Sequence, residues 1–391
     1  MNRDSVAPQT GSLLRAPTSV TMPLMSWRAG AASLLAIVTI AAPAAAQGIV
    51  RAQARDEAGQ SGWVAIREGR HQDAAAAFAL ALDVEPRDPS LHLGAGLASF
   101  LLGQPTAARL SLERALMLAP SLTPASVLLG DILYKNSDIA GAIQVYEAAL
   151  PYDPDDKTLH SRLDALRREA ALYDNFFASH GARFTVLFEG PADEAIASRA
   201  IEILEAAYWR VATALAVYPE NVITVVLYTQ QQFRDITRSP QWAGGAYDGR
   251  IRVPVRGTAA DSRELERVLV HELTHAFVQS VAPRGVPRWL HEGLAVMFEP
   301  EGASWSDQQL ADAPLRLPLP RLADSFASLS TAEARMAYAQ SAGIVHAMFD
   351  RGGPGAIGAL LGDIARGEPF ASAFERHFLT PTDAFFESLA R

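Results

Sequence analysis

A repeat of 34 residues runs through residues 55–156 and constrains the fold of this part of the chain more than any other feature. Pro86, Pro120 and Pro154 stand 34 residues apart. The same step links three further sets: Gly69, Gly103 and Ser137; Ala74, Ala108 and Ala142; and Ala81, Ala115 and Ala149. A fixed period that holds in four registers is typical of a solenoid, in which similar units stack on one another. The sequence therefore predicts about three stacked units in this region.

Each unit has the pattern of a helix pair. A small residue lets the two helices approach closely, Phe78, Leu112 and Tyr146 fill the groove between them, and the proline ends the second helix. These features resemble the tetratricopeptide repeat, which implies an all-α superhelix over residues 47–157 with a groove for a peptide or a partner protein. The alternative is that the units serve only as a structural spacer. Residues 158–180 would form the helix that caps the stack and links it to the next domain.

The N-terminus carries one apolar run, from Ala29 to Ala42, which follows Arg28 and ends in small residues up to Ala46. A charged start, a short apolar run and a small-x-small ending are typical of a secretory signal peptide, so residues 1–46 are predicted to be removed. The run is short for a membrane span, although an uncleaved anchor helix is the alternative. The mature protein is therefore expected to be exported, either periplasmic or secreted, with no membrane span of its own.

After Gly181 the pattern changes from helices to short strands. Arg183–Phe188 and Asn221–Tyr228 are β-branched and aromatic runs, separated by a helical stretch from Asp193 to Val217. A third strand is predicted at Arg250–Val255, where Pro254 cannot donate to a ladder and so favours a sheet edge. The sequence is helical from about residue 261 onward. The expected class for this half is α+β, a mixed sheet backed by helices.

Composition limits the chemistry that this chain can carry. The formal net charge is −9, which disfavours a nucleic-acid partner, and the absence of cysteine excludes thiolate metal sites and cysteine nucleophiles. Any metal must therefore be bound by His, Asp or Glu. The motif His271-Glu272-Leu273-Thr274-His275 lies in a predicted helix over about 262–281. Positions i and i+4 share a helix face, so both imidazoles can bind one cation while Glu272 faces the attacking water.

A second motif follows, Trp289-Leu290-His291-Glu292-Gly293-Leu294-Ala295. With this pair of motifs, residues 181–391 resemble the gluzincin metallopeptidases of the peptidase-MA-like group. The resemblance implies a zincin-like domain that holds one zinc ion per chain by His271, His275 and Glu292. His291 is also a potential ligand, but it lies about 100° around the helix from Glu292, and only one of the two can point at the metal. We expect Glu292 to be the ligand and His291 to lie at the rim.

The resemblance also implies catalytic roles. Glu272 would act as the general base, and Tyr338 would donate a hydrogen bond to the oxyanion, although an ordinary core tyrosine is the alternative there. Thermolysin-like relatives carry an Asp four residues after the ligand Glu, where this chain has Val296. Either another carboxylate orients the histidine, with Glu299 as a candidate, or the ligands are held more loosely. The role expected for Glu299 is a solvated helix end.

The predicted function is an exported zinc-dependent peptidase with a repeat domain that binds substrate or a partner. A peptide or protein substrate would bind by strand addition at the edge around Tyr247–Val255, although that segment could instead be a structural hairpin. The alternative from another class is a noncatalytic tetratricopeptide scaffold with a structural or idle metal site.

Overall fold

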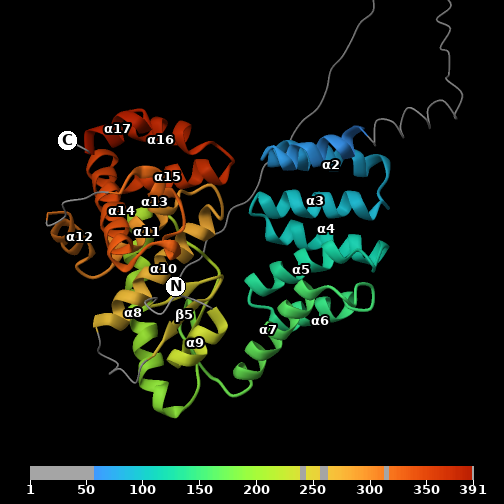
Figure 1. Cartoon of the computed structure of the whole chain (residues 1–391), viewed down its shortest axis with the longest axis horizontal. Coiled ribbons are helices and arrows are strands. Elements are labelled where there is room, and N and C mark those ends of the chain that lie inside the picture. The colour runs from blue at the N-terminus through green and yellow to red at the C-terminus, as the bar shows by residue number, and fades with distance from the viewer. Residues whose placement is uncertain (1–56, 238–243, 256–262, 312–316, 390–391) are drawn as a thin grey trace, which may run out of the picture. The chain divides into compact units, whose positions relative to one another are not determined.

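The computed structural model describes residues 57–237, 244–255, 263–311 and 317–389 (Figure 1). The predicted signal peptide, residues 1–46, lies outside the described residues. Gly48–Arg391 form one compact unit by themselves. Within the described ranges, no helix has both the length and the hydropathy that a membrane crossing requires.

The repeat region is all-α, as the 34-residue period predicts. A helix over 57–67 is followed by α2 (His71–Val84), α3 (Pro89–Leu101), α4 (Pro105–Leu118), α5 (Thr123–Lys135), α6 (Ile139–Ala149) and α7 (Lys157–Tyr173). Helices α3, α5 and α7 begin 34 residues apart, and so do α2, α4 and α6. The repeat therefore corresponds to helix pairs, with α7 as the last helix of the stack (Figure 1).

The helix pairs pack through a large side chain against a glycine. Phe78 and Tyr146 are buried. A Cβ atom placed on Gly94 would lie 2.3 Å from the Phe78 ring, and one on Gly130 would lie 2.1 Å from the Tyr146 ring. Because real Cβ atoms do not approach so closely, only glycine fits at these two positions. Neither glycine is among the residues of the four registers that define the repeat, so those registers did not point to these two contacts.

The turn inside each helix pair uses a left-handed backbone conformation. Gly69, Gly103 and Ser137 hold this position in successive units, with φ of 73°, 72° and 67°. Glycine adopts such a φ without strain, whereas a residue with a Cβ does so at a cost. Ser137 is therefore the strained member of the three.

The expected capping helix over 158–180 is shorter than predicted. Helix α7 ends at Tyr173, and after a turn the chain forms β1 (Phe177–His180), which pairs antiparallel with β2 (Phe184–Phe188). The strand was missed because its four residues are largely exposed and show no apolar alternation. Residues 177–180 thus belong to the sheet and not to a helix.

The sheet has five strands in the order β1-β2-β3-β5-β4. Strands β2, β3 (Ile223–Tyr228) and β5 (Ile251–Pro254) are parallel, and β4 (Ala246–Tyr247) pairs antiparallel with β5. The predicted edge at Pro254 is therefore wrong in detail, because β4 and not β5 is outermost. Val255 N–H donates to Tyr228 O on β3 at 2.7 Å, so by alternation the nitrogen of Pro254 faces the other side, beyond the end of β4.

Helices cover both faces of the sheet and extend the domain to its C-terminus. Val225, Leu227, Ile251 and Val253 belong to one core with α8 (Glu194–Leu215) and α10 (Arg263–Val281). The opposite face packs on α7 and α9 (Gln230–Thr237). The remaining helices are α11 (Arg288–Phe298), α12 (Gly302–Ala311), α13 (Leu319–Ala323), α14 (Thr331–Gly352), α15 (Pro354–Ala365), α16 (Phe370–Phe378) and α17 (Thr382–Leu389), with 3-10 turns at Pro191–Asp193 and Phe326–Ser328. The α+β class is confirmed.

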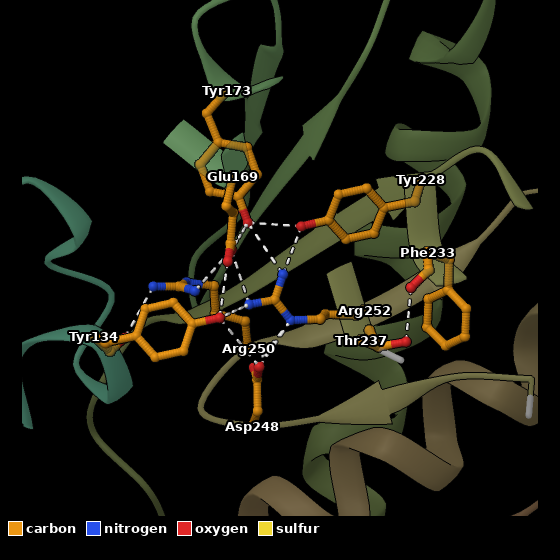
Figure 2. A network of polar contacts seen from close by, with 9 residues as sticks. All are labelled: Tyr134, Glu169, Tyr173, Tyr228, Phe233, Thr237, Asp248, Arg250 and Arg252. Carbon is orange, nitrogen blue, oxygen red and sulfur yellow. Dashed lines mark hydrogen bonds and ion pairs between the residues drawn. The ribbon is translucent and has the colours of Figure 1, made fainter. Parts of the chain in front are cut away.

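A buried polar cluster joins α7 to the face of the sheet away from α10 (Figure 2). Arg250 and Arg252, both buried, place their guanidinium nitrogens 3.1 and 2.8 Å from the Glu169 carboxylate. The same carboxylate accepts hydrogen bonds from the hydroxyls of Tyr134 and Tyr173 at 2.8 and 2.6 Å. Burial alone would raise the pKa of Glu169, but the two arginines outweigh it and lower that pKa. Each buried charge here therefore has a partner of opposite sign.

Candidate metal centre

Helix α10 presents two histidines to a cavity. His271 and His275 lie one turn apart on one face of the helix, with ring centroids 4.8 Å from each other. Leu269, Leu273 and Phe277 are fully buried in the core on the other faces of the same helix. Because the apolar residues fix how α10 is rotated, the two imidazoles are held toward the cavity.

Helix α11 brings a carboxylate to the same place. Trp289 is buried, with its ring 5.7 Å from Phe370 and 5.5 Å from Phe386, edge to face. Gly293, one turn after Trp289 and next to Glu292, packs closely against α14. A Cβ atom placed on Gly293 would lie 2.3 Å from the backbone oxygen of Ser341. These two contacts fix the position of α11, and Glu292 points toward α10.

Three side chains meet as a candidate metal site. Nε2 of His271 and Nε2 of His275 lie 3.5 and 3.4 Å from Oε2 of Glu292. The three ligand atoms all lie within 4.8 Å of one another. Oε2 of Glu292 is buried and accepts no hydrogen bond from any residue that the structure describes. A buried carboxylate oxygen normally has partners, so an orphaned one between two imidazole nitrogens fits a divalent cation that prefers N and O ligands.

The charges around this point also favour a cation. Glu272, Glu292 and Glu299 are all almost fully buried close to the two histidines. Burial by itself would lower the pKa of His271, but the carboxylates of Glu292 and Glu299 outweigh it and raise that pKa to about 10. Burial likewise opposes ionisation of Glu292, yet His275 and His271 hold its pKa well below the usual range. The site is thus built around buried negative charge.

Glu299 orients one of the histidines, which corrects the expectation of a solvated helix end. Its side chain is 8% exposed, and Oε1 accepts a hydrogen bond from Nδ1 of His271 at 2.6 Å. This hydrogen bond fixes the proton on Nδ1 and turns Nε2 toward Glu292, so Nε2 is the nitrogen that would bind a cation in place of its own proton. Arg267, which the sequence did not single out, donates to the other oxygen of Glu299 at 3.3 Å. Glu299, seven residues after Glu292, therefore orients the histidine in place of the Asp that thermolysin-like relatives carry where this chain has Val296.

Glu272 lies on α10 between the two histidines and faces the cavity. Burial raises its pKa. Gly245, next to the edge strand β4, leaves room for this carboxylate, because a Cβ atom there would lie 2.8 Å from Oε1 of Glu272. The segment Tyr247–Val255, predicted as one edge strand, is instead the end of β4 and the whole of β5, which pair antiparallel, and only β4 and the glycines before it line the cavity.

Tyr338 and His291 take different positions. Tyr338, on α14, lines the cavity, with its ring 6.1 Å from that of His271 and 5.3 Å from that of Phe326. Burial raises the pKa of Tyr338, so the phenol keeps its proton and can donate. His291 is outside the three-ligand cluster, with its ring 5.8 Å from that of His275. Burial and nearby His275 lower the pKa of His291 to about 4, so it is neutral at pH 7.

The cavity that contains these residues has a volume of about 1000 Å³. It is lined by β4 and by residues of α10, α11, α12 and α14. This volume is at the upper end of the range, about 300–1000 Å³, that is usual for ligand-binding pockets. The three candidate metal ligands, the carboxylate of Glu272, the phenol of Tyr338 and the edge strand β4 share this one cavity.

The part of the chain that holds the candidate centre matches a known protein family. Residues 205–380 match the Peptidase MA superfamily, a range that contains every residue of the candidate centre. The chain carries a Peptidase MA superfamily domain. That superfamily is commonly metal-dependent. The Peptidase MA domain follows tetratricopeptide repeats, whose models match residues 60–123 and 99–166. Tetratricopeptide repeats imply a role in protein–protein interaction.

Solved structures resemble part of the chain. The first TPR of Spaghetti (RPAP3), bound to the HSP90 peptide SRMEEVD, is 21% identical with a TM-score of 0.29, and the match covers 30% of this chain and 97% of that one. The Arabidopsis OM64 TPR domain is 16% identical with a TM-score of 0.30, covering 30% and 98%. No curated protein matches the chain.

Proposed function

We propose that this protein is an exported zinc-dependent peptidase that holds one zinc ion per chain by His271, His275 and Glu292. The observation that carries the proposal is the orphaned Oε2 of Glu292, buried between two imidazole nitrogens at 3.4 and 3.5 Å. An ion is the partner that this oxygen lacks. Two neutral imidazoles with one carboxylate form the ligand set of hydrolytic zinc sites, which keep a position open for water.

The proposed reaction is hydrolysis of a peptide bond. Zinc, when bound, would polarise the scissile carbonyl and make the attacking water more acidic. Glu272 takes a proton from that water and passes it to the leaving amine, a role for which a buried carboxylate with a raised pKa is suited. Tyr338, protonated and facing the cavity, donates a hydrogen bond to the oxyanion of the substrate. Glu299 holds the His271 ring in the tautomer that binding requires.

The substrate is a peptide or protein that adds as a strand beside β4. This edge strand lines the same cavity as Glu272, and it offers backbone groups to an extended chain. In the proposal the repeats bind the substrate or a partner protein, and the leader over 1–46 directs the chain to the periplasm or outside the cell.

Metal analysis tests the ligand assignment. The purified protein is expected to contain about one zinc ion per chain, removable by a chelator, and His271→Ala and Glu292→Ala are expected to lose it. His346→Ala is the matched control, because that histidine also lies on a helix of this domain but is 41% exposed and outside the cluster. Equal zinc content in His271→Ala and the wild type would refute the assignment.

Turnover tests the catalytic role. Glu272→Gln is expected to keep zinc and lose hydrolysis of exported-protein substrates, whereas Glu266→Gln, a carboxylate on the same helix that also lines the cavity, keeps both. Equal cleavage by Glu272→Gln and wild type would exclude Glu272 as the base. If the wild type binds zinc and binds exported proteins but leaves them uncleaved, the hypothesis of a noncatalytic scaffold replaces the peptidase hypothesis.

A further inference from the structure

Four arginines line the cavity, and within the described ranges three of them pair with a carboxylate. Arg267 pairs with Glu264 at 2.8 Å and with Glu299 at 3.3 Å. Arg263 and Arg288 lie 3.5 Å from Glu301 and Glu292, in that order. The fourth arginine of the lining has no carboxylate partner among the described residues, which sets it apart from the other three.

That remaining arginine is Arg335, on α14. Among the residues that the structure describes, no carboxylate pairs with it, and its side chain is exposed. The lining residues nearest to Arg335 in sequence are Thr331 and Ala334, which carry no charge. Phe326, whose ring packs against that of Tyr338, is uncharged as well. Arg335 is therefore a positive charge that no described residue neutralises.

Arg335 also lies close to the proposed reaction. It precedes Tyr338 by three residues on the same helix, and side chains at this spacing share a face with Cβ atoms about 5–6 Å apart. The Tyr338 ring in turn lies 6.1 Å from the His271 ring. An extended peptide advances about 3.3 Å per residue, so Arg335 would reach a substrate group within about three to four residues of the scissile bond.

We propose that Arg335 is a specificity-determining residue that binds a carboxylate of the substrate. This inference rests on the proposed peptidase function and names the class of peptide that it prefers. The guanidinium offers a planar fork of donors that matches a carboxylate with two parallel hydrogen bonds. The carboxylate comes either from an Asp or Glu side chain within this reach of the scissile bond or from the free C-terminus of the peptide.

Matched peptides measure this preference and separate the two sources. One pair carries Glu or Gln at the residues within this reach of the cleaved bond, and the other pair has a free or an amidated C-terminus. The zinc-loaded full chain is expected to favour the carboxylate member of one pair by about tenfold or more in kcat/KM. Preference in the first pair assigns an acidic side-chain subsite, and preference in the second assigns carboxypeptidase cleavage.

Each variant is judged by the ratio of kcat/KM between the two peptides of a pair, because a general change in activity affects both peptides equally and leaves the ratio unchanged. Arg335→Gln is expected to bring the ratio close to one, and Arg335→Lys to give an intermediate ratio because it keeps the charge but loses the fork. Arg321→Gln is the matched control, since Arg321 lies outside the cavity and 3.6 Å from Glu333. The same carboxylate preference in Arg335→Gln as in the wild type would overturn the proposal.

A binding measurement keeps the inference separate from the proposed function. Zinc-loaded Glu272→Gln protein is titrated with the same peptides, with and without Arg335→Gln. If the wild type cleaves no peptide, the peptidase proposal fails, yet a carboxylate preference in binding that Arg335→Gln removes still supports the role of Arg335. If binding shows no such preference, the role of Arg335 is wrong whatever the turnover shows.

Discussion

Replacing Glu299 should weaken zinc binding although Glu299 is not a ligand. Its Oε1 accepts from Nδ1 of His271 at 2.6 Å, and its side chain is 8% exposed, so water cannot readily take its place. Groups that orient a ligand in this way contribute about 10- to 100-fold to metal affinity. Converted to free energy, this range is about 1.4–2.8 kcal/mol.

The two substitutions at this position should differ. Glu299→Gln keeps the size of the side chain and still offers a carbonyl oxygen to Nδ1 of His271, but it removes the charge. We therefore expect zinc affinity to fall by about tenfold, the lower end of this range. Glu299→Ala leaves a buried N–H without an acceptor and releases Arg267, so we expect the upper end, about 100-fold. Zinc affinity is measured by competition with a chromophoric chelator, at constant pH.

Glu301→Gln is the control for this experiment. Glu301 is a nearby cavity carboxylate, but its side chain is 75% exposed and pairs with Arg263 and not with a histidine. It should bind zinc as the wild type does. If Glu299→Ala also binds zinc with wild-type affinity, the hydrogen bond to His271 does not orient the ligand and this reasoning is wrong.

Three further substitutions test the fold that carries the site. Ser137→Gly should raise the free energy of unfolding by about 0.5–1 kcal/mol in chemical denaturation, because it relieves a φ of 67°; a loss of stability would contradict this. Glu169→Gln should lower the free energy of unfolding at pH 7 by about 3–5 kcal/mol, since Arg250 and Arg252 lose their shared partner. The pKa of Glu169 is lowered in the folded state, so its contribution is present above the ordinary value of 4.5 and lost as pH falls, and the variant's deficit should shrink below that pH; a deficit that is constant with pH would exclude the charge as its cause. Gly293→Ala should force α11 away from α14 at a cost of about 1–3 kcal/mol and weaken zinc binding in the same chelator assay, and unchanged zinc affinity would show that this contact does not position Glu292.

The sequence could predict those parts of the molecule that depend on helical periodicity. The 34-residue step placed the helix pairs because identical units must repeat identical contacts. The spacing of His271 and His275 is likewise a property of one helix, and the second motif lies on a helix that begins at Arg288. The structure brings these residues and Glu292 together as the motifs predict.

The parts that sequence could not predict depend on how the chain leaves its regular elements. Glu299 follows the end of α11 with φ −60° and ψ 151°, so a helical projection does not tell where its side chain points. Strand β4 has two residues, too few for a pattern, and so β5 looked like the edge. Arg250 and Arg252 alternate with Ile251 and Val253 as on a solvated strand face, and they are buried because α7 and Tyr134 of α5 pack against them.

The polar cluster of Figure 2 determines where this protein can be divided. A fragment that starts at Gly181 would keep Arg250 and Arg252 on its sheet but would lose Glu169, their common anion, together with two tyrosine hydroxyls. Without Glu169, the guanidinium groups of Arg250 and Arg252 would have to be hydrated on the sheet face that α7 otherwise covers. A cut between the repeats and the sheet should therefore destabilise the sheet, and a stable fragment of this domain needs to begin before α7.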